Sequence, residues 1–478
     1  MGASVTMPMW LVLALGCLSA AAVLQFFLLP GVRWFFRRKM NRVIEDVNTR
    51  FNIEIPEFKV TRRQVLIDRL FHDEKVQAAV VQFCEAQQQP RSEVLRRVDR
   101  YAREIVPSFN AYAYFRWGYR IAKYYARWLY RVRLGYTDSA ALAAINPHSS
   151  VVFVMNHRSN MDYVLVAFLA AERTALSYAV GEWARIWPLH SLIRSMGAYF
   201  VRRNSGDALY RTVLQRYVQM ATEGGVPQAV YPEGGLSHDG KLRAPKLGLL
   251  DYMLRAFDPR GARDLVFIPV GINYDRVLED RTLLRKLDVT LPRRGFIAAM
   301  LTVGSFFVRN AWLMMTGRWY RYGYACVNFG RPLSMRDYVA HAGVDFRALD
   351  EDARHRAVQA VGQTLMRAIR DVIPVLPVSL VATALLREKE SALSEFDLKT
   401  KVYDLVRQLE QDGAHVYVPR SDLDYAIGVG LRMLTLRHIV RDEDGLYRVA
   451  TSERPLLEYY ANAIAPLVDD LAMVKGAA

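Results

Sequence analysis

The chain has 478 residues and a formal net charge of +16. Hydrophobic residues make up 52% of the chain and aromatic residues 12%. A chain this basic and this apolar suits an anionic partner, either nucleic acid or an anionic membrane. Its three cysteines, Cys17, Cys84 and Cys326, lie far apart without zinc or disulfide spacing. They exclude a disulfide-stapled domain and favour a reducing compartment.

The N-terminal segment favours the membrane. No charged side chain precedes Arg33, and Trp10–Leu29 is an apolar stretch of about 20 residues, the length that spans hydrocarbon. A basic cluster follows directly: Arg33, Arg37, Arg38 and Lys39. We predict a retained anchor with its basic flank over residues 1–39, and the positive-inside rule places the rest of the chain in the cytoplasm. The competing interpretation is a cleaved signal peptide, but the segment lacks the basic n-region that signal peptides carry.

Residues 40–140 alternate apolar and charged positions at helical spacing and are predicted to be helical, without strands. Within them, Tyr112–Tyr136 interleaves aromatic side chains with Arg and Lys. Such interleaving binds bases and phosphates in nucleic-acid-binding proteins. Beside a membrane anchor, it indicates a region that lies in the headgroup zone of the bilayer.

Residues 141–385 alternate short apolar runs with helical stretches, which predicts an α/β domain with its chemistry at the ends of strands. The predicted strands are Val151–Met155, Ala198–Val201, Gln228–Tyr231, Leu265–Ile272 and Ala325–Phe329. The apolar segment Gly295–Gly317 is predicted as a helix that packs on the bilayer, over an acyl pocket, or in the core.

Residues 386–478 predict a small helical accessory domain. Glu388–Gly413 reads as a charged amphipathic helix, and Leu434–Val449 contains two strand-like pieces around Asp444-Gly445, a hairpin turn signal. The sequence shows no catalytic pattern in this domain.

The first polar block is Val151–Asp162, an apolar run that leads to His157 and Asp162. An imidazole beside a carboxylate can make a hydroxyl nucleophilic near neutral pH, because the carboxylate orients the ring and stabilises its protonated form. His157 is the candidate base and Asp162 its orienting partner, and the attacking hydroxyl can belong to the substrate. Taken alone, the pair is also typical of a structural histidine at a strand-to-helix turn.

Three further blocks follow in chain order, each at the end of an apolar run: Gly197–Arg203, Tyr231–Gly248 and Phe267–Asp275. The first ends in Arg202 and Arg203, whose planar guanidinium groups suit phosphate oxygens, although paired arginines also occur at solvated strand ends. The Gly234-Gly235 pair predicts a turn in which the backbone adopts positive φ or approaches another group closely.

The order of the four blocks resembles the glycerophospholipid acyltransferase superfamily, and most closely the bacterial glycerol-3-phosphate 1-acyltransferases, over roughly residues 100 to 385. The matching pieces are His157 to Tyr163, Phe200 to Arg203, Glu233-Gly234-Gly235 with Gly240-Lys241 and Pro245-Lys246, and Ile268-Pro269-Val270 through Asp275. The resemblance implies a mixed sheet flanked by helices. It also implies catalytic roles for His157 and Asp162, and substrate-binding roles for Arg202, Arg203, Glu233, Gly234, Gly235, Lys246 and Pro269.

One departure bears on the acceptor. The family usually has Arg directly after Glu-Gly-Gly and a second basic residue two positions later, where this chain has Leu236 and His238. Glu233 is expected to organise the Arg pair or Lys246, or to contact the acceptor hydroxyl; a plain turn is the alternative. No metal is expected, because the spacing of His157, Asp162, His238 and Asp239 fits none of the usual zinc patterns.

The expected function is transfer of a fatty acyl group from acyl-CoA or acyl carrier protein to the sn-1 hydroxyl of glycerol 3-phosphate, in phospholipid biosynthesis. The enzyme would be anchored in a bacterial inner membrane, with its catalytic domain cytoplasmic and with no cofactor and no nucleic acid. One alternative is a lysophosphatidate or other lysophospholipid acceptor. Another is a non-catalytic basic protein that binds membranes or nucleic acid, which has no reason to gather His157, Asp162, Arg202 and Glu233 into one pocket.

Overall fold

The computed structural model describes residues 56–109, 118–170, 176–180, 193–202, 205–287, 321–387 and 392–468, together with residues 114, 305, 312 and 315. The predicted anchor, Arg203 and all but three residues of Gly295–Gly317 lie outside these ranges. Within them, no helix combines the length and the apolar character needed to cross a membrane.

A central sheet of eight strands organises the described part of the chain, in the order β1-β7-β6-β2-β5-β3-β4, with β8 paired to β6. β2 is parallel to both β5 and β6, whereas β7 is antiparallel to β6, so the sheet is mixed, as the sequence predicts. The strands are β1 (Arg131–Thr137), β2 (Ser150–Met155), β3 (Ser177–Val180), β4 (Tyr199–Phe200), β5 (Gln228–Val230), β6 (Leu265–Tyr274), β7 (Tyr324–Phe329) and β8 (Leu333–Ser334).

Helices cover both faces of the sheet. Neighbouring residues of β2 point to opposite faces and therefore pack into two different clusters. Phe153 and Met155 pack into a cluster with residues of α7 (Tyr119–Leu129) and α9 (Met161–Ala170). Val152 and Val154 pack into a second cluster with residues of α11 (Ala208–Glu223), α12 (Gly248–Leu254) and α16 (Glu351–Asp371). With both faces covered, central strands can be almost wholly apolar, and all ten residues of β6 are buried.

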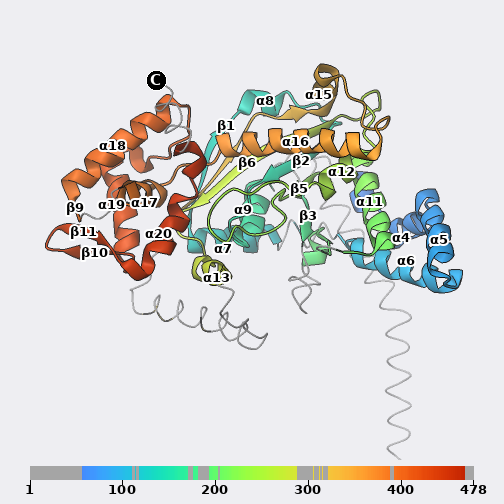
Figure 1. Cartoon of the computed structure of the whole chain (residues 1–478), viewed down its shortest axis with the longest axis horizontal. Helices are drawn as coiled ribbons and strands as arrows, with labels where there is room; N and C mark the ends of the chain where they lie inside the picture. Colours follow the sequence, from blue (N-terminus) through green and yellow to red (C-terminus); the bar gives the residue numbers. More distant parts are fainter. Residues whose placement is uncertain are drawn as a thin grey trace, which may run out of the picture.

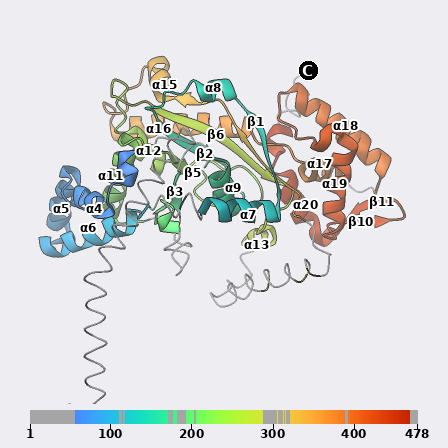
Figure 2. The same ribbon diagram turned by 180° about the vertical axis from the view of Figure 1, so that it is seen from behind.

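The N-terminal helices and the C-terminal residues lie at opposite ends of this sheet (Figures 1 and 2). The N-terminal group comprises α3 (Glu57–Val60), α4 (Arg63–Phe71), α5 (Glu74–Gln87) and α6 (Arg91–Ile105). It packs on α11, where Asp73, the N-cap of α5, forms an ion pair with Arg216 at 2.7 Å.

The prediction that residues 40–140 contain no strand is wrong for Arg131–Thr137. These residues form β1 and pair in parallel with β7, upstream of residue 141. Val132, Leu134 and Tyr136 do alternate with other residues, but the strand lies at the sheet edge and is mostly exposed. An exposed strand has no buried face that requires apolar residues, so its sequence does not differ clearly from that of the aromatic and basic helix before it.

The C-terminal unit begins at α17 (Pro377–Arg387), earlier than the predicted residue 386, since α17 packs against the three helices that follow. These are α18 (Glu395–Gln411), α19 (Leu423–Thr435) and α20 (Arg454–Ala461), beside a small sheet of β9 (Leu393–Ser394), β10 (Val440–Glu443) and β11 (Leu446–Val449). Asp444 and Gly445 have φ of 53° and 80°, so the predicted Asp-Gly hairpin is confirmed.

Shorter elements complete the described fold. They are the helices α8 (Ser139–Ala143), α13 (Asp280–Arg285) and α15 (Met335–Ala342), and the 3₁₀ turns η4 (Pro419–Ser421) and η5 (Thr451–Glu453). Of these, α13 matters most for the site, because it follows β6 and contacts α20.

Candidate active site

His157 and Asp162 form a hydrogen-bonded pair at the carboxyl end of β2. His157 Nδ1 lies 2.9 Å from Asp162 Oδ2. Asp162 is the second residue of α9, and the same oxygen accepts backbone N–H groups from Arg158 at 2.7 Å and Ser159 at 3.0 Å. The carboxylate thus holds the backbone of the connecting loop by two hydrogen bonds. It lies in the first turn of α9, where the helix dipole favours a negative charge. The predicted pairing of base and orienting partner is present in the structure.

Tyr274, near the end of β6, completes the surroundings of Asp162. Its hydroxyl donates to Asp162 Oδ1 at 2.6 Å, and Asp162 is fully buried. Both oxygens of Asp162 thus act as hydrogen-bond acceptors. With Asp162 as the acceptor, Nδ1 of His157 carries the proton and Nε2 is the nitrogen that can accept one. The base is therefore set up in the tautomer that general-base catalysis needs.

Glu233 holds the backbone of the base. Its Oε1 accepts the N–H of His157 at 2.8 Å, and its Oε2 accepts the N–H of Arg243 at 3.0 Å. Burial raises the pKa of Glu233 to about 7, an effect that these two hydrogen bonds and the charges of Arg158 and Arg243 partly offset. Among the described residues, the hydrogen-bond partners of Glu233 are thus backbone amides of the first and third blocks, and not the side chains of Arg202 or Lys246.

The raised pKa of Glu233 makes the stability of the fold depend on pH. The folded carboxyl keeps its proton up to a higher pH than the unfolded one, whose pKa is near 4.5. The stabilisation is therefore complete below pH 4.5 and is lost as pH rises through 7, a change of roughly 3 kcal/mol. We expect Glu233→Gln to remove this part of the pH dependence, measured as urea unfolding midpoints between pH 5 and 8.

The matched control for this experiment is Glu223→Gln, because Glu223 is exposed at the end of α11. It should follow the wild-type pH profile. Parallel profiles for the wild type and Glu233→Gln would contradict the assignment.

The glycine turn positions the side chain of Lys246. Gly234 has φ of +69°, and a Cβ on it would collide with the aliphatic part of Lys246. The turn is closed by the N–H of Gly234, which donates to Tyr231 O at 2.9 Å, and by the N–H of Lys246, which donates to Pro232 O at 2.8 Å. Gly235 follows, half-buried. The predicted positive φ and close approach are both found at Gly234.

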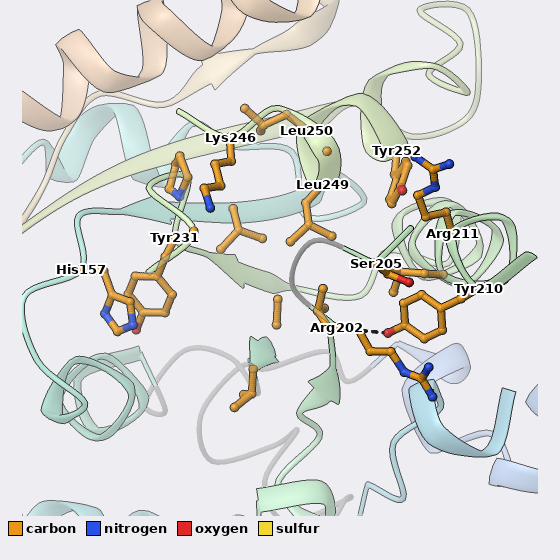
Figure 3. A pocket seen from close by; sticks show the side chains of 18 of the residues that line it. His157, Arg202, Ser205, Tyr210, Arg211, Tyr231, Lys246, Leu249, Leu250 and Tyr252 are labelled. Atoms are coloured by element: carbon orange, nitrogen blue, oxygen red, sulfur yellow. Dashed lines mark hydrogen bonds between the residues drawn. The ribbon is translucent and has the colours of Figure 1, made fainter. Parts of the chain in front are cut away.

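A cavity of about 430 Å³ lies beside this turn, lined by His157, Gly234 and Lys246 and bounded largely by apolar and aromatic side chains (Figure 3). The ring of His157 stacks on Tyr231 with centroids 4.0 Å apart. Two further cations, Arg202 and Arg211, line the cavity, and no carboxylate is among the described residues that line it. The electrostatics of the cavity therefore suit an anionic ligand with an apolar part.

Arg202 lines the cavity, but its guanidinium group is occupied. It pairs with both oxygens of Glu104 in α6, at 2.8 and 2.6 Å, and lies over the rings of Tyr101 and Tyr210. In Figure 3 it points away from His157. The predicted partner Arg203 lies outside the described residues.

Pro269 is inside β6, opposite Val154 of β2, and its carbonyl accepts the N–H of Gly330 at 2.9 Å. It is buried in the sheet and is not among the residues that line the cavity. Its place in the fourth block is thus structural in this geometry.

The departure at Leu236 has a clear structural form. Leu236 packs against the core, and the next residue, Ser237, donates its N–H to His157 O at 2.9 Å. This turn supports the loop of the base without supplying a cation. In the described residues, no group of three or more His, Cys, Asp or Glu is arranged to hold a metal ion.

Sequence patterns alone did not identify Tyr274, Arg211 and Glu279 as parts of the site. Tyr274 was visible inside the fourth block, but its target was not. Glu279 accepts hydrogen bonds from Ser159 Oγ at 2.7 Å and Asn160 Nδ2 at 3.1 Å, and so holds the loop between His157 and Asp162. Arg211 lies in the first turn of a helix, where no strand-end signal marks it.

Comparisons with known proteins identify an acyltransferase region in the part of the chain that carries this site. Residues 139–273 match the acyltransferase family model, and residues 311–477 match the glycerol-3-phosphate acyltransferase C-terminal region. The glycerol-3-phosphate acyltransferase of Pseudomonas putida is 26% identical over 421 residues, which are 85% of this chain and 49% of that protein. The glycerol-3-phosphate acyltransferase of Xanthomonas axonopodis is 28% identical over 374 residues, which are 76% of this chain and 41% of that protein.

The predicted resemblance is thus confirmed: two family models match the chain, and curated glycerol-3-phosphate acyltransferases are 26% and 28% identical to it over most of its length. It spans about half the length of the curated relatives it matches. A solved 1-acyl-sn-glycerophosphate acyltransferase from Thermotoga maritima is 15% identical with a TM-score of 0.29, covering 65% of this chain and 96% of that one. That similarity is too low to bear on the fold.

Proposed function

We propose that the chain transfers a fatty acyl group from acyl-CoA or acyl carrier protein to the sn-1 hydroxyl of glycerol 3-phosphate, as a step of phospholipid biosynthesis. The observation that carries the proposal is the buried His157–Asp162 pair, whose His157 lines a cavity that Lys246, Arg202 and Arg211 also line. A non-catalytic binding protein would not need an oriented base at that wall.

The chemistry follows from the tautomer of His157. Nε2 takes the proton of the acceptor hydroxyl while the hydroxyl oxygen attacks the thioester carbonyl, and Asp162 stabilises the imidazolium that forms. As the tetrahedral intermediate collapses, the C–S bond breaks and the thiolate takes the proton from the imidazolium. The products are an ester and a free thiol, and no covalent enzyme intermediate is required.

The acceptor phosphate is held by Lys246 and Arg211, and the predicted contributions of Arg202 and Arg203 are kept as part of the proposal. Lys246 is favoured because its stem packs over Gly234 in the turn that also supports the base. A lysophosphatidate acceptor is the second candidate, supported by Leu236, which replaces a cation with an apolar side chain next to the same turn.

Membrane attachment is proposed through an N-terminal span in a bacterial inner membrane, with the catalytic domain on the cytoplasmic side. It is supported by α7, which exposes 58% of Ile121 and 74% of Tyr124 between exposed arginines, as expected for a helix at a bilayer surface. Flotation of the full chain with anionic vesicles tests this attachment. We expect high salt to leave it bound, and release by salt alone would exclude an anchor.

The experiment for the proposed reaction is an acceptor panel. Purified full chain with a labelled acyl donor should give a higher kcat/KM for glycerol 3-phosphate than for lysophosphatidate, and little transfer to glycerol, which lacks the phosphate. Preference for lysophosphatidate would favour the second candidate. Absence of transfer to every acceptor, with either donor, would contradict an acyltransferase role.

A further inference from the structure

Arg158, the residue directly after the base, is buried against the C-terminal unit. Its side chain is 3% exposed and lies over the ring of Tyr459 in α20, 4.9 Å from the ring centroid. One guanidinium nitrogen donates to Gly240 O, whereas Nε and Nη2 have no hydrogen-bond partner among the described residues. The aromatic face of Tyr459 therefore helps to stabilise the buried guanidinium charge, and cation–π attraction is strong when the cation is shielded from water.

The same helix contacts the third block. Gly240 has φ of +86°, and a Cβ there would collide with the carbonyl of Tyr459. One turn along, Asn462 Nδ2 donates to Asp239 O at 2.9 Å. The close approach of two backbones explains why glycine stands at position 240, and it joins α20 to the loop that leaves Glu233.

Two residues of the fourth block, Asn273 and Asp275, contact the C-terminal unit. Tyr274 faces Asp162, but its neighbour Asp275 accepts the N–H of Val378 at 3.1 Å, at the start of α17. On the other side, Asn273 Nδ2 donates to Ser379 Oγ of α17 at 3.3 Å. One strand end thus holds the catalytic carboxylate and the first helix of the C-terminal unit together.

Helix α13 repeats this double attachment. Glu279 accepts hydrogen bonds from the loop between His157 and Asp162, and the next residue, Asp280, pairs with Arg437 of the C-terminal unit at 2.7 Å. Both Asp280 and Arg437 are largely buried, and the hydroxyl of Tyr460 donates to Asp280. Three described segments that contact the His157–Asp162 loop are therefore each held by residues of the C-terminal unit as well.

We propose that the C-terminal unit, residues 377–468, is a positioning element of the catalytic pair, and that Tyr459 acts on His157 through the side chain of Arg158. The sequence showed no chemistry in this unit, and its role is to hold the loop rather than to touch substrate. The expected effect on turnover rests on the proposed acyltransferase function. The expected effect on the loop itself does not.

The test compares Tyr459→Leu and Arg158→Met in the full chain with Tyr403→Leu, a matched control at an exposed tyrosine of α18. Tyr459→Leu should lower kcat by roughly 10- to 100-fold, as misplacement of a catalytic group does, and leave the acceptor KM within about twofold. Tyr459→Phe, which keeps the ring face, should retain most of the activity. An unchanged kcat in Tyr459→Leu, or a failure of Tyr459→Phe to restore it, would overturn the proposal.

Hydrogen exchange supplies a readout that does not need activity. Tyr459→Leu and Arg158→Met should speed amide exchange in residues 157–162, and leave the N-terminal helices 57–105 as protected as in the wild type. Exchange that is unchanged in the loop, or faster everywhere, would overturn the proposal. If the wild type transfers no acyl group, the proposed function fails, while this measurement still decides the structural inference.

The double variant Arg158→Met/Tyr459→Leu tests the contact itself. If both residues act through one interaction, the double variant should exchange in the loop no faster than the more affected single variant. Additive effects would show that the two residues act separately, against the proposal.

Discussion

Replacing His157 by Ala should lower kcat by roughly 10²- to 10⁴-fold, the range for loss of a general base. The ring is buried at the cavity wall and its Nδ1 is hydrogen-bonded to Asp162, and alanine has no group that can take the proton in place of Nε2. The backbone N–H of residue 157 keeps its bond to Glu233 in the variant, and the loop should stay folded. Initial rates at saturating acceptor measure the loss.

The graded comparison is Asp162→Asn. An asparagine can place its oxygen where Oδ2 accepts its three donors, and its amide can donate to the Tyr274 hydroxyl, so the geometry survives while the charge is lost. We expect a smaller fall in kcat than for His157→Ala, with an unchanged acceptor KM. Near wild-type activity in His157→Ala, with an intact far-UV spectrum, would exclude this residue as the base.

Replacing Lys246 by Met should raise the acceptor KM by roughly 10- to 100-fold, because a charge-assisted hydrogen bond contributes about 1.5 to 3 kcal/mol. The ammonium group binds the phosphate in the ground state and in the transition state alike, so kcat should change far less than KM. Met keeps the aliphatic stem that packs over Gly234. Michaelis plots for each substrate separate the acceptor from the donor.

Arg202 gives the informative contrast. Because the guanidinium group of Arg202 already pairs with Glu104, Arg202→Ala should raise the acceptor KM less than Lys246→Met does. It should lower the unfolding midpoint, because it removes this ion pair between α6 and the strand end. Lys286→Met, at an exposed lysine after α13, is the control and should change neither quantity. Equal effects of Lys246→Met on donor and acceptor KM would contradict the phosphate assignment.

The core of the sheet could be predicted from the sequence because its strands are short apolar runs bounded by polar blocks. β2, β5, β6 and β7 fall within one or two residues of their predicted bounds. β1 escaped prediction since an edge strand needs little apolar surface. β3 (Ser177–Val180) escaped too, being a four-residue strand inside a longer mixed segment.

The catalytic pair could be predicted because both residues lie in one block, five positions apart. Contacts between distant segments could not. Nothing local to Tyr274 shows that its hydroxyl reaches Asp162, and nothing local to Arg202 shows that Glu104, 98 residues earlier, occupies its fork. The positioning role of α20 is hidden for the same reason, since Tyr459 lies 301 residues from Arg158.

The central claim is acyl transfer to the sn-1 hydroxyl of glycerol 3-phosphate at the His157 cavity. The most direct test is the structure of the product that the purified full chain forms from ¹³C-carbonyl-labelled acyl-CoA or acyl carrier protein and glycerol 3-phosphate, read by NMR. We expect one ester, at the sn-1 position, formed by the wild type and absent with His157→Ala. An ester at sn-2, or the same product yield from the His157→Ala variant, would contradict the account.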